Sequence, residues 1–468
     1  MAEMTNNNSL SRIPLLVCFA AVAIAIMHMR SNNHIKPAIM TGLHSTIPMV
    51  IDESSISSWM NTDVDSSLMQ GYERCNIEKL RENDMTPSRF YEEFWRNKPV
   101  ILLREENLNK VAQSMTQKET LLNDFANASI PLAKMESYAY RDEQSGLLKD
   151  YIDKMSQEEI PSRASQFAFS TDRFGIGKVY AVPRILSSIP NLLDPSFQIA
   201  IAGSGSGLAF HWHGDVFAET LHGSRRWFLF APHTSPQFNP RSTSADWVRS
   251  IRSSLFTDQN ETPTNIPQNL QECTMKQNEV IYVPADWFHS TLSLGEAVSI
   301  TTSFASTYRQ DRYAMDNGTS DNAKMLDAFS KRDYMRAIHY AKKVIQHRTN
   351  NFAPYSWLGL LQTMDAMEHH TETTDAFRVA LQVAHQSTSQ CIKLNPHFCP
   401  CHVWATRQLM ALSFTFKDEN PSIEQSLVKQ AQYHTRMAEK LSSTEDDEML
   451  DPGFQPKVMK EERRKPRV

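Results

Sequence analysis

Three residues that could bind a metal ion lie at alternate positions in one short segment of the chain. They are His211, His213 and Asp215, and they alternate with Phe210, Trp212 and Gly214. If residues 208–215 form a strand, alternate side chains point to the same face, so the three candidate ligands would point the same way. Converging imidazole and carboxylate groups are typical ligands of iron, copper and zinc.

A further candidate ligand, His289, lies downstream of these three. It follows a β-branched run at residues 279–283 and then Pro284, which favours a tight turn. A strand and a turn of this kind could bring His289 to the first segment. For any one histidine, a hydrogen-bonded core residue is the ordinary alternative. Three histidines in segments that can converge favour a metal site.

The elements that must position these residues are mostly strands. Apolar and β-branched runs predict strands at residues 98–103, 197–202 and 296–304. Residues 86–95 predict a helix that Thr86 caps at its N-terminus.

Together these motifs resemble the Jumonji-C (JmjC) branch of the double-stranded β-helix oxygenases. The resemblance rests on the H-x-H segment, the Trp-Phe-His run at 287–289, the glycine-rich run at 202–207 and residues 226–229. It extends over about residues 72–305 and is strongest to a member found in the endoplasmic reticulum lumen. The resemblance implies an α+β chain with a double-stranded β-helix (jelly-roll) domain. It also implies Fe(II) and 2-oxoglutarate as cofactors and hydroxylation of a protein side chain as the activity.

The resemblance leaves two ligand sets open. Counted from Gly223, His211 matches the first ligand of the family, and His213 stands where the family has Asp or Glu. The resulting set of His211, His213 and His289 can bind Fe(II) but is less anionic than two histidines and a carboxylate. A shift of two residues makes His213 and Asp215 the first pair, but it shortens the connection to the following strand.

The resemblance also implies a cation that binds the distal carboxylate of 2-oxoglutarate. Related hydroxylases use a lysine two residues after the glycine, and Arg225 occupies the matching position. A guanidinium can bind a carboxylate through two parallel hydrogen bonds, although arginine and lysine are not geometrically equivalent. The alternative is a solvated strand charge beside Arg226.

An uncharged apolar run at residues 13–27 indicates entry into the secretory pathway. The run is short for a membrane-spanning helix and matches the apolar part of a secretory signal or signal-anchor. Sequons for N-glycosylation follow it at Asn127, Asn260 and Asn317. We therefore expect a luminal protein of the endoplasmic reticulum, which is either cleaved after the run or anchored as a single-pass type II membrane protein.

The chain has 6 cysteines, too few for a disulfide scaffold. Cys75 and Cys273 match cysteines of the resembled luminal member, and the resemblance implies a disulfide between them. Three others, Cys391, Cys399 and Cys401, are spaced too tightly for the usual zinc chelate and indicate a disulfide or free thiols.

The chain divides into five parts along its length. We expect the signal or anchor at residues 1–30 and a flexible stalk at 31–70. The JmjC domain is expected at 71–308, a helical region at 309–445 and a disordered charged tail at 446–468. The helical region resembles tetratricopeptide (TPR) repeats, with wider spacing than the usual repeat of about 34 residues. It could bind a peptide, dimerise or pack on the barrel as a lid.

The net charge and the sequence motifs together limit the possible functions. A net charge of -5 gives no general attraction to nucleic acid, so a protein or peptide is the expected partner. Two functions remain open: an Fe(II)- and 2-oxoglutarate-dependent oxygenase, or a non-catalytic JmjC-fold protein that binds a partner. Conversion of 2-oxoglutarate to succinate would distinguish them. The oligomeric state is not defined by the sequence.

Overall fold

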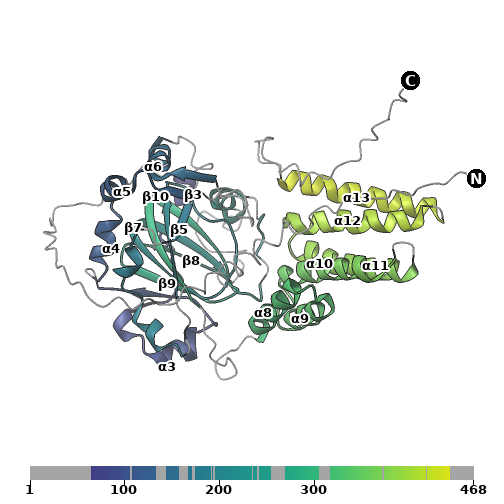
Figure 1. Cartoon of the computed structure of the whole chain (residues 1–468), viewed down its shortest axis with the longest axis horizontal. Helices are drawn as coiled ribbons and strands as arrows, with labels where there is room; N and C mark the ends of the chain where they lie inside the picture. The colour runs from purple at the N-terminus through teal and green to yellow at the C-terminus, as the bar shows by residue number, and fades with distance from the viewer. Residues whose placement is uncertain are drawn as a thin grey trace, which may run out of the picture.

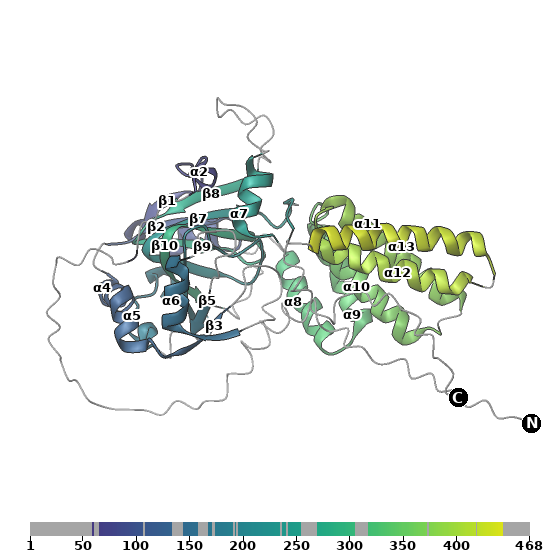
Figure 2. The same cartoon turned by 90° about the horizontal axis from the view of Figure 1, so that it is seen from above.

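The computed structural model describes Trp59 and residues 65–105, 108–132, 144–157, 167–170, 174–190, 192, 195–234, 236–239, 242–253, 269–304, 317–371, 374–417 and 419–442. A sheet-based part comes first, and a part made of helices follows and lies beside it (Figures 1 and 2). The apolar run at residues 13–27, the tail at 446–468 and Asn260 lie outside the described residues. Within the described ranges, no helix is long and apolar enough to cross a membrane.

One eight-stranded sheet forms the centre of the first part. Its order is β1 (Lys79–Arg81), β2 (Val100–Leu103), β9 (Glu279–Val283), β7 (Val216–Phe230), β10 (Phe288–Ser303), β6 (Ser196–Ala202) and β5 (Phe167–Ser170), with β8 (Leu270–Met275) paired to β7. Strands β1 and β2 are parallel, and the other pairs are antiparallel. A separate pair consists of β3 (Ser129–Leu132) and β4 (Gln144–Leu147).

The longest strands, β7 and β10, pair along almost their whole length. Side chains alternate across β7: Trp227 and Leu229 join one buried cluster, whereas Phe228 and Phe230 join another on the opposite face. The sequence predicted the end of β10 as a separate strand at 296–304. The structure instead continues one strand from Phe288, with a register irregularity between Leu294 and Val298.

Short helices surround the sheet. The predicted helix at 86–95 is split into α3 (Pro87–Arg89) and a π-helix (Phe90–Phe94), and the Thr86 hydroxyl accepts a hydrogen bond from the Arg89 N–H, as expected for a cap. The remaining short helices of this part, among the described residues, are α2 (Ser66–Met69), η1 (Glu82–Asp84), α4 (Lys110–Met115), α5 (Lys118–Phe125), α6 (Leu148–Gln157), η5 (Ile176–Lys178), η6 (Arg184–Ser188), α7 (Ser244–Trp247) and η7 (Val248–Arg252).

Part of the segment predicted as a flexible stalk is folded. Trp59 is buried and donates to the Thr116 carbonyl, and Leu68 of α2 is fully buried. The Arg226 guanidinium donates to the Leu68 carbonyl, which fixes α2 against the sheet. The folded part therefore begins before residue 71, because apolar residues in a polar stretch were enough to anchor it.

In the described residues from 317 onward, six helices form three antiparallel hairpins (Figure 1). They are α8 (Asn317–Ser330), α9 (Tyr334–His347), α10 (Phe352–His369), α11 (Asp375–Leu394), α12 (Cys399–Phe416) and α13 (Pro421–Ser442). Asp333, Asn351 and Thr374 cap α9, α10 and α11 with their side chains. A disulfide joins Cys391 to Cys401, and Cys399 is a buried free thiol.

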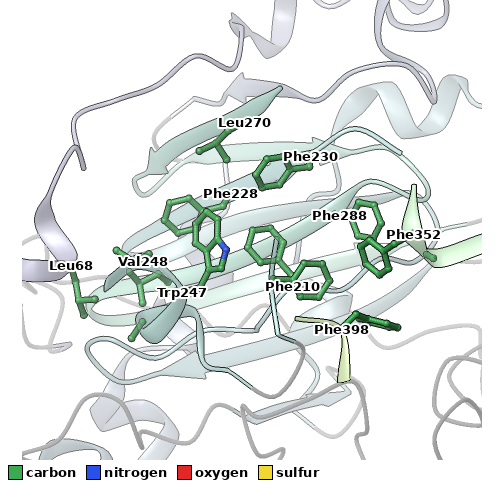
Figure 3. Packing of buried hydrophobic residues seen from close by; sticks show 14 of the residues in the cluster. Leu68, Phe210, Phe228, Phe230, Trp247, Val248, Leu270, Phe288, Phe352 and Phe398 are labelled. Carbon is green, nitrogen blue, oxygen red and sulfur yellow. The ribbon is translucent and has the colours of Figure 1, made fainter. Parts of the chain in front are cut away.

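The helices pack directly on the sheet through an aromatic cluster (Figure 3). Phe352 of α10 and Phe398, which precedes α12, lie next to Phe288 and Phe238 of the first part, with ring centroids 4.7 to 6.4 Å apart. Among the roles left open for the helical region, packing against the barrel is the one that the contacts support.

Candidate metal centre

The segment that carries His211 and His213 is not a regular strand. It runs antiparallel to β10 with interrupted pairing, because the Leu208 N–H donates to the Thr291 hydroxyl and not to a main-chain carbonyl. A side chain at Gly207 would place its Cβ 1.7 Å from the Thr291 carbonyl oxygen, so only glycine permits this close approach. The predicted strand at 208–215 is therefore replaced by an extended segment held closely against β10.

The same segment meets β10 again at the histidines. His211 and His289 form an isolated antiparallel bridge, with N···O distances of 3.0 and 2.9 Å between their backbones. This pairing places the two imidazoles side by side, with ring centroids 4.2 Å apart. His213, two residues on, brings its ring to 4.6 Å from that of His289.

The ligand atoms of His211, His213 and His289 converge. One nitrogen from each ring lies within 4.8 Å of the others. Each Nδ1 lies 2.7 to 2.9 Å from a backbone carbonyl oxygen, at Ala209, Gly214 and Trp287 respectively. A carbonyl can only accept, so each neutral ring donates from Nδ1 and leaves the Nε2 lone pair free, as metal-bound histidines commonly do.

All three imidazoles are held in the neutral form that binds metals. Burial, and after it the nearby His213, lowers the pKa of His211 from 6.5 to about 3. Burial also lowers the pKa of His213, and it lowers that of His289 well below the usual value, with the two other rings adding to the effect at His289. Metal binding at neutral pH would therefore require no proton to leave these rings.

Asp215, the alternative ligand, lies outside this cluster. Its buried carboxylate accepts from the Tyr282 hydroxyl at 2.7 Å, from the Ala285 N–H at 3.1 Å and from Arg96 Nε at 3.1 Å. A carboxylate held by three donors in the wall of the sheet is neutralised there and is not directed at the histidines. The structure thus assembles the three-histidine set and uses Asp215 as a structural anion.

Arg225 is a buried cation without a carboxylate partner among the described residues. Its Nη1 donates to the Ser299 hydroxyl and its Nη2 to the Thr291 hydroxyl at 2.9 Å, while Nε has no hydrogen-bond partner in the part of the chain that the structure describes. Burial lowers its pKa to about 10. Thr291 is two residues after His289 on β10, so this guanidinium lies on the side of the strand that carries the metal ligand.

The neighbouring arginine behaves differently. Arg226 points to the other face of β7 and forms a 3.1 Å ion pair with the buried Glu272. Arg225 is therefore not the solvated strand charge that the sequence left as an alternative. Its guanidinium has no carboxylate partner among the described residues and donates to two hydroxyls, which is the chemistry of a carboxylate-binding site.

Two other sets of predicted residues can be placed. Cys75 and Cys273 are joined, with an S–S distance of 2.05 Å, and the bond ties the N-terminal segment to β8. Asn127 is exposed in the turn between α5 and β3, and Asn317 is the first residue of α8. The sequence did not identify Thr291 and Ser299 as neighbours of Arg225, because their approach depends on the pairing of β10 with β7, including the register irregularity between Leu294 and Ser299.

Comparison with known proteins agrees with this geometry. A family described as a cupin-like domain matches residues 28–310. JmjC domain-containing protein 8 of Mus musculus is 28% identical over 266 residues, which cover 55% of this chain and 92% of that protein. The Homo sapiens protein of the same name is 29% identical over 239 residues, which cover 49% and 84%.

A more distant similarity is to arginine-specific demethylase JMJ22 of Arabidopsis thaliana. It is 26% identical over 153 residues, which cover 29% of this chain and 30% of that protein. The family match spans more than half of the chain and includes all three histidines and Arg225. The chain therefore belongs to the cupin-like family that contains the JmjC domains.

Proposed function

We propose that this protein is an Fe(II)- and 2-oxoglutarate-dependent oxygenase that hydroxylates a protein side chain. One observation carries the metal site: the Nε2 atoms of His213 and His289 lie 3.1 Å apart while both Nδ1 atoms already donate to carbonyls. Two lone pairs at this distance repel each other unless they share a cation. Nitrogens this close can both reach one ion at the usual bond length of about 2.1 Å.

Residues of the chain would bind two cofactors, the metal ion and 2-oxoglutarate. His211, His213 and His289 would hold Fe(II), and Arg225 would bind the distal carboxylate of 2-oxoglutarate, aided by the Thr291 and Ser299 hydroxyls. When bound, Fe(II) and 2-oxoglutarate would supply the oxidation. Oxygen and 2-oxoglutarate would yield succinate and carbon dioxide, and one oxygen atom would enter a C–H bond of the substrate. The buried aromatic Trp227, whose ring is 6.1 Å from that of His289, excludes water on one side.

A protein side chain is the substrate class that the comparisons favour. The Arabidopsis thaliana relative is named as an arginine-specific demethylase, which supports an amino-acid side chain as the substrate here. In this chain the absence of a carboxylate from the histidine set favours a second candidate, a non-catalytic binding protein. Three neutral imidazoles leave more positive charge on the ion than the two-histidine, one-carboxylate triad that is typical of Fe(II) oxygenases.

Turnover of 2-oxoglutarate separates the two candidates. Purified protein would be incubated with Fe(II), ascorbate, oxygen and 2-oxoglutarate, and succinate would be measured with and without a library of peptides. We expect succinate from the wild type, none from His289→Ala, and strongly reduced succinate from Arg225→Met at 2-oxoglutarate concentrations that do not saturate the variant. Metal binding without any succinate, across all peptides, would favour the binding protein.

We also propose that the protein acts in the lumen of the endoplasmic reticulum. The apolar run at residues 13–27 and three downstream sequons support this location. A Cys75–Cys273 disulfide is also in keeping with an oxidising compartment. Imaging of the tagged full chain beside a luminal marker would test it, and a cytosolic distribution would contradict it.

A further inference from the structure

The turn that carries His289 is bound by residues of the helical part. Asp286 lies in this turn with a φ of 64°, a conformation that Asp tolerates better than most residues. Its N–H donates to the His213 carbonyl at 2.8 Å, so the main chain of Asp286 links the two ligand segments. Its side chain points the other way, toward the helices.

The Asp286 carboxylate is held by two helical residues. Arg348, which follows the last residue of α9, donates from Nη2 to Oδ2 at 3.1 Å, and Asn322 of α8 donates from Nδ2 to Oδ1 at 3.3 Å. The side chains of this ion pair are only 5% and 9% exposed. A buried pair of this kind is costly to break, because removal of one partner leaves the other charge desolvated and unpaired.

Aromatic contacts support the ligand segments from the same side. Phe288, which precedes His289, stacks on Phe352 of α10 with ring centroids 5.5 Å apart. Trp212, between the two other histidines, packs edge-on against Phe288 at 4.9 Å and Phe352 at 6.4 Å. Because side chains alternate, these aromatic residues point toward the helical part, and the histidines lie on the other side of the same segments.

We propose that the helical part is a component of the metal centre and that Arg348 is its principal positioning residue. Through Asp286, Arg348 fixes the turn that presents His289, and through the Asp286 N–H it fixes His213 as well. This inference rests on the metal site of the proposed function. It adds a requirement that the cupin-like match, which ends at residue 310, does not contain.

Two measurements on the full-length protein test this role. The first is Co(II) affinity and the visible Co(II) spectrum, which reports ligand geometry. The second is hydrogen exchange of the Asp286 and His289 amides without metal. We expect Arg348→Met to weaken Co(II) binding about 10- to 100-fold, the range for residues that orient metal ligands, and to accelerate exchange at both amides. Arg348→Lys should restore part of the affinity.

Arg378→Met is the matched control, since Arg378 lies in α11 and pairs with Glu419 far from the turn. It should leave Co(II) binding and exchange at 286 and 289 unchanged. If Arg348→Met does not fold, Asp286→Asn is used instead, because Asn also tolerates a positive φ. A wild-type Co(II) affinity and spectrum in the Arg348 or Asp286 variant would overturn the proposal, even if exchange were faster.

Different results would refute the metal site and the positioning role of Arg348. If the wild type binds no Co(II), the metal site itself is refuted, and exchange alone then decides whether Arg348 orders the histidine turn. Faster exchange at Asp286 and His289 in Arg348→Met, with α12 amides unchanged, would support that positioning. Unchanged exchange would overturn it.

Discussion

The backbone of His211 pairs with the backbone of His289 through two hydrogen bonds of 3.0 and 2.9 Å. Ligands from segments far apart in the chain are thus aligned by main-chain geometry. The imidazoles need only a rotamer choice to converge, and hydrogen bonds from Nδ1 to carbonyls make that choice. A preorganised site of this kind binds its ion without the cost of ordering the ligands.

The first prediction separates the two ligand sets. His211→Ala should abolish binding of Mn(II) in a calorimetric titration, because it removes one of three ligands. Asp215→Asn should leave Mn(II) affinity close to that of the wild type but lower the free energy of unfolding by roughly 3 kcal/mol, since it breaks a buried ion pair with Arg96. If Asp215→Asn were the variant that lost Mn(II) binding, the ligand set of three histidines would be incorrect.

The second prediction concerns Arg225. Arg225→Met should weaken 2-oxoglutarate binding to the Mn(II)-loaded protein roughly 10- to 100-fold, the value of lost hydrogen bonds to a charged group. The same change should raise the free energy of unfolding by roughly 1 kcal/mol, because an unpaired buried cation is replaced by an apolar side chain. Calorimetry and urea unfolding measure the two effects, and Arg225→Met with unaltered 2-oxoglutarate affinity would remove Arg225 from the pocket.

The third prediction concerns the Cys75–Cys273 disulfide, which closes a loop with a sequence separation of 198. In the chain-entropy description such a cross-link stabilises the folded state by about 5 kcal/mol. Cys75→Ser with Cys273→Ser should therefore lower the urea midpoint and leave Co(II) binding intact. Peptide mapping under non-reducing conditions provides the control, and two free thiols in the wild type would contradict the prediction.

The fourth prediction concerns acid stability of the helical part. His402 and His434 lie with their Nδ1 atoms 3.0 Å apart, and burial, followed by the neighbouring His402 and His385, lowers the pKa of His434 from 6.5 to about 4. Between these values the unfolded chain binds a proton that the folded chain does not. Stability is therefore full above pH 6.5 and falls as the pH drops toward 4.

This loss should amount to roughly 1 to 2 kcal/mol after allowance for the solvent around a half-buried ring. Thermal unfolding between pH 7.5 and 4.5 measures it, and His434→Gln should flatten the part of the pH profile that His434 contributes. A parallel decline in the wild type and His434→Gln would assign the effect to other groups.

The fifth prediction concerns glycosylation at Asn127, whose side chain is exposed. Full-length protein from secretory cells should lose mass on endoglycosidase treatment. The shift should shrink in Asn127→Gln and disappear when Asn260 and Asn317 are also changed. A chain of unmodified mass would argue against the luminal location.

The histidines and Arg225 could be predicted because their signals are local. Alternation of His211 and His213, a Pro-led turn before His289 and a cation two residues after Gly223 each lie within a few residues. The helical part was also evident, since its helix formers extend over long segments.

Other features depend on contacts between distant segments. Asp215 has the spacing of a ligand, yet its role is decided by Arg96 and Tyr282, which approach from other elements. Likewise, the sequence around Arg348 has the appearance of an ordinary helix end. Its partner Asp286 becomes apparent only when the helices pack on the sheet.

The aromatic cluster also bears on where the chain can be cut. The cupin-like match ends at residue 310, but Phe352 and Phe398 beyond it cover Phe288 and Phe238. Even the end of α13 touches the barrel, where Asn239 donates to the Leu441 carbonyl at 2.7 Å. A barrel produced alone would expose this aromatic face to water and self-associate through it. The smallest autonomous unit thus extends to the end of α13, well beyond the boundary of the family domain.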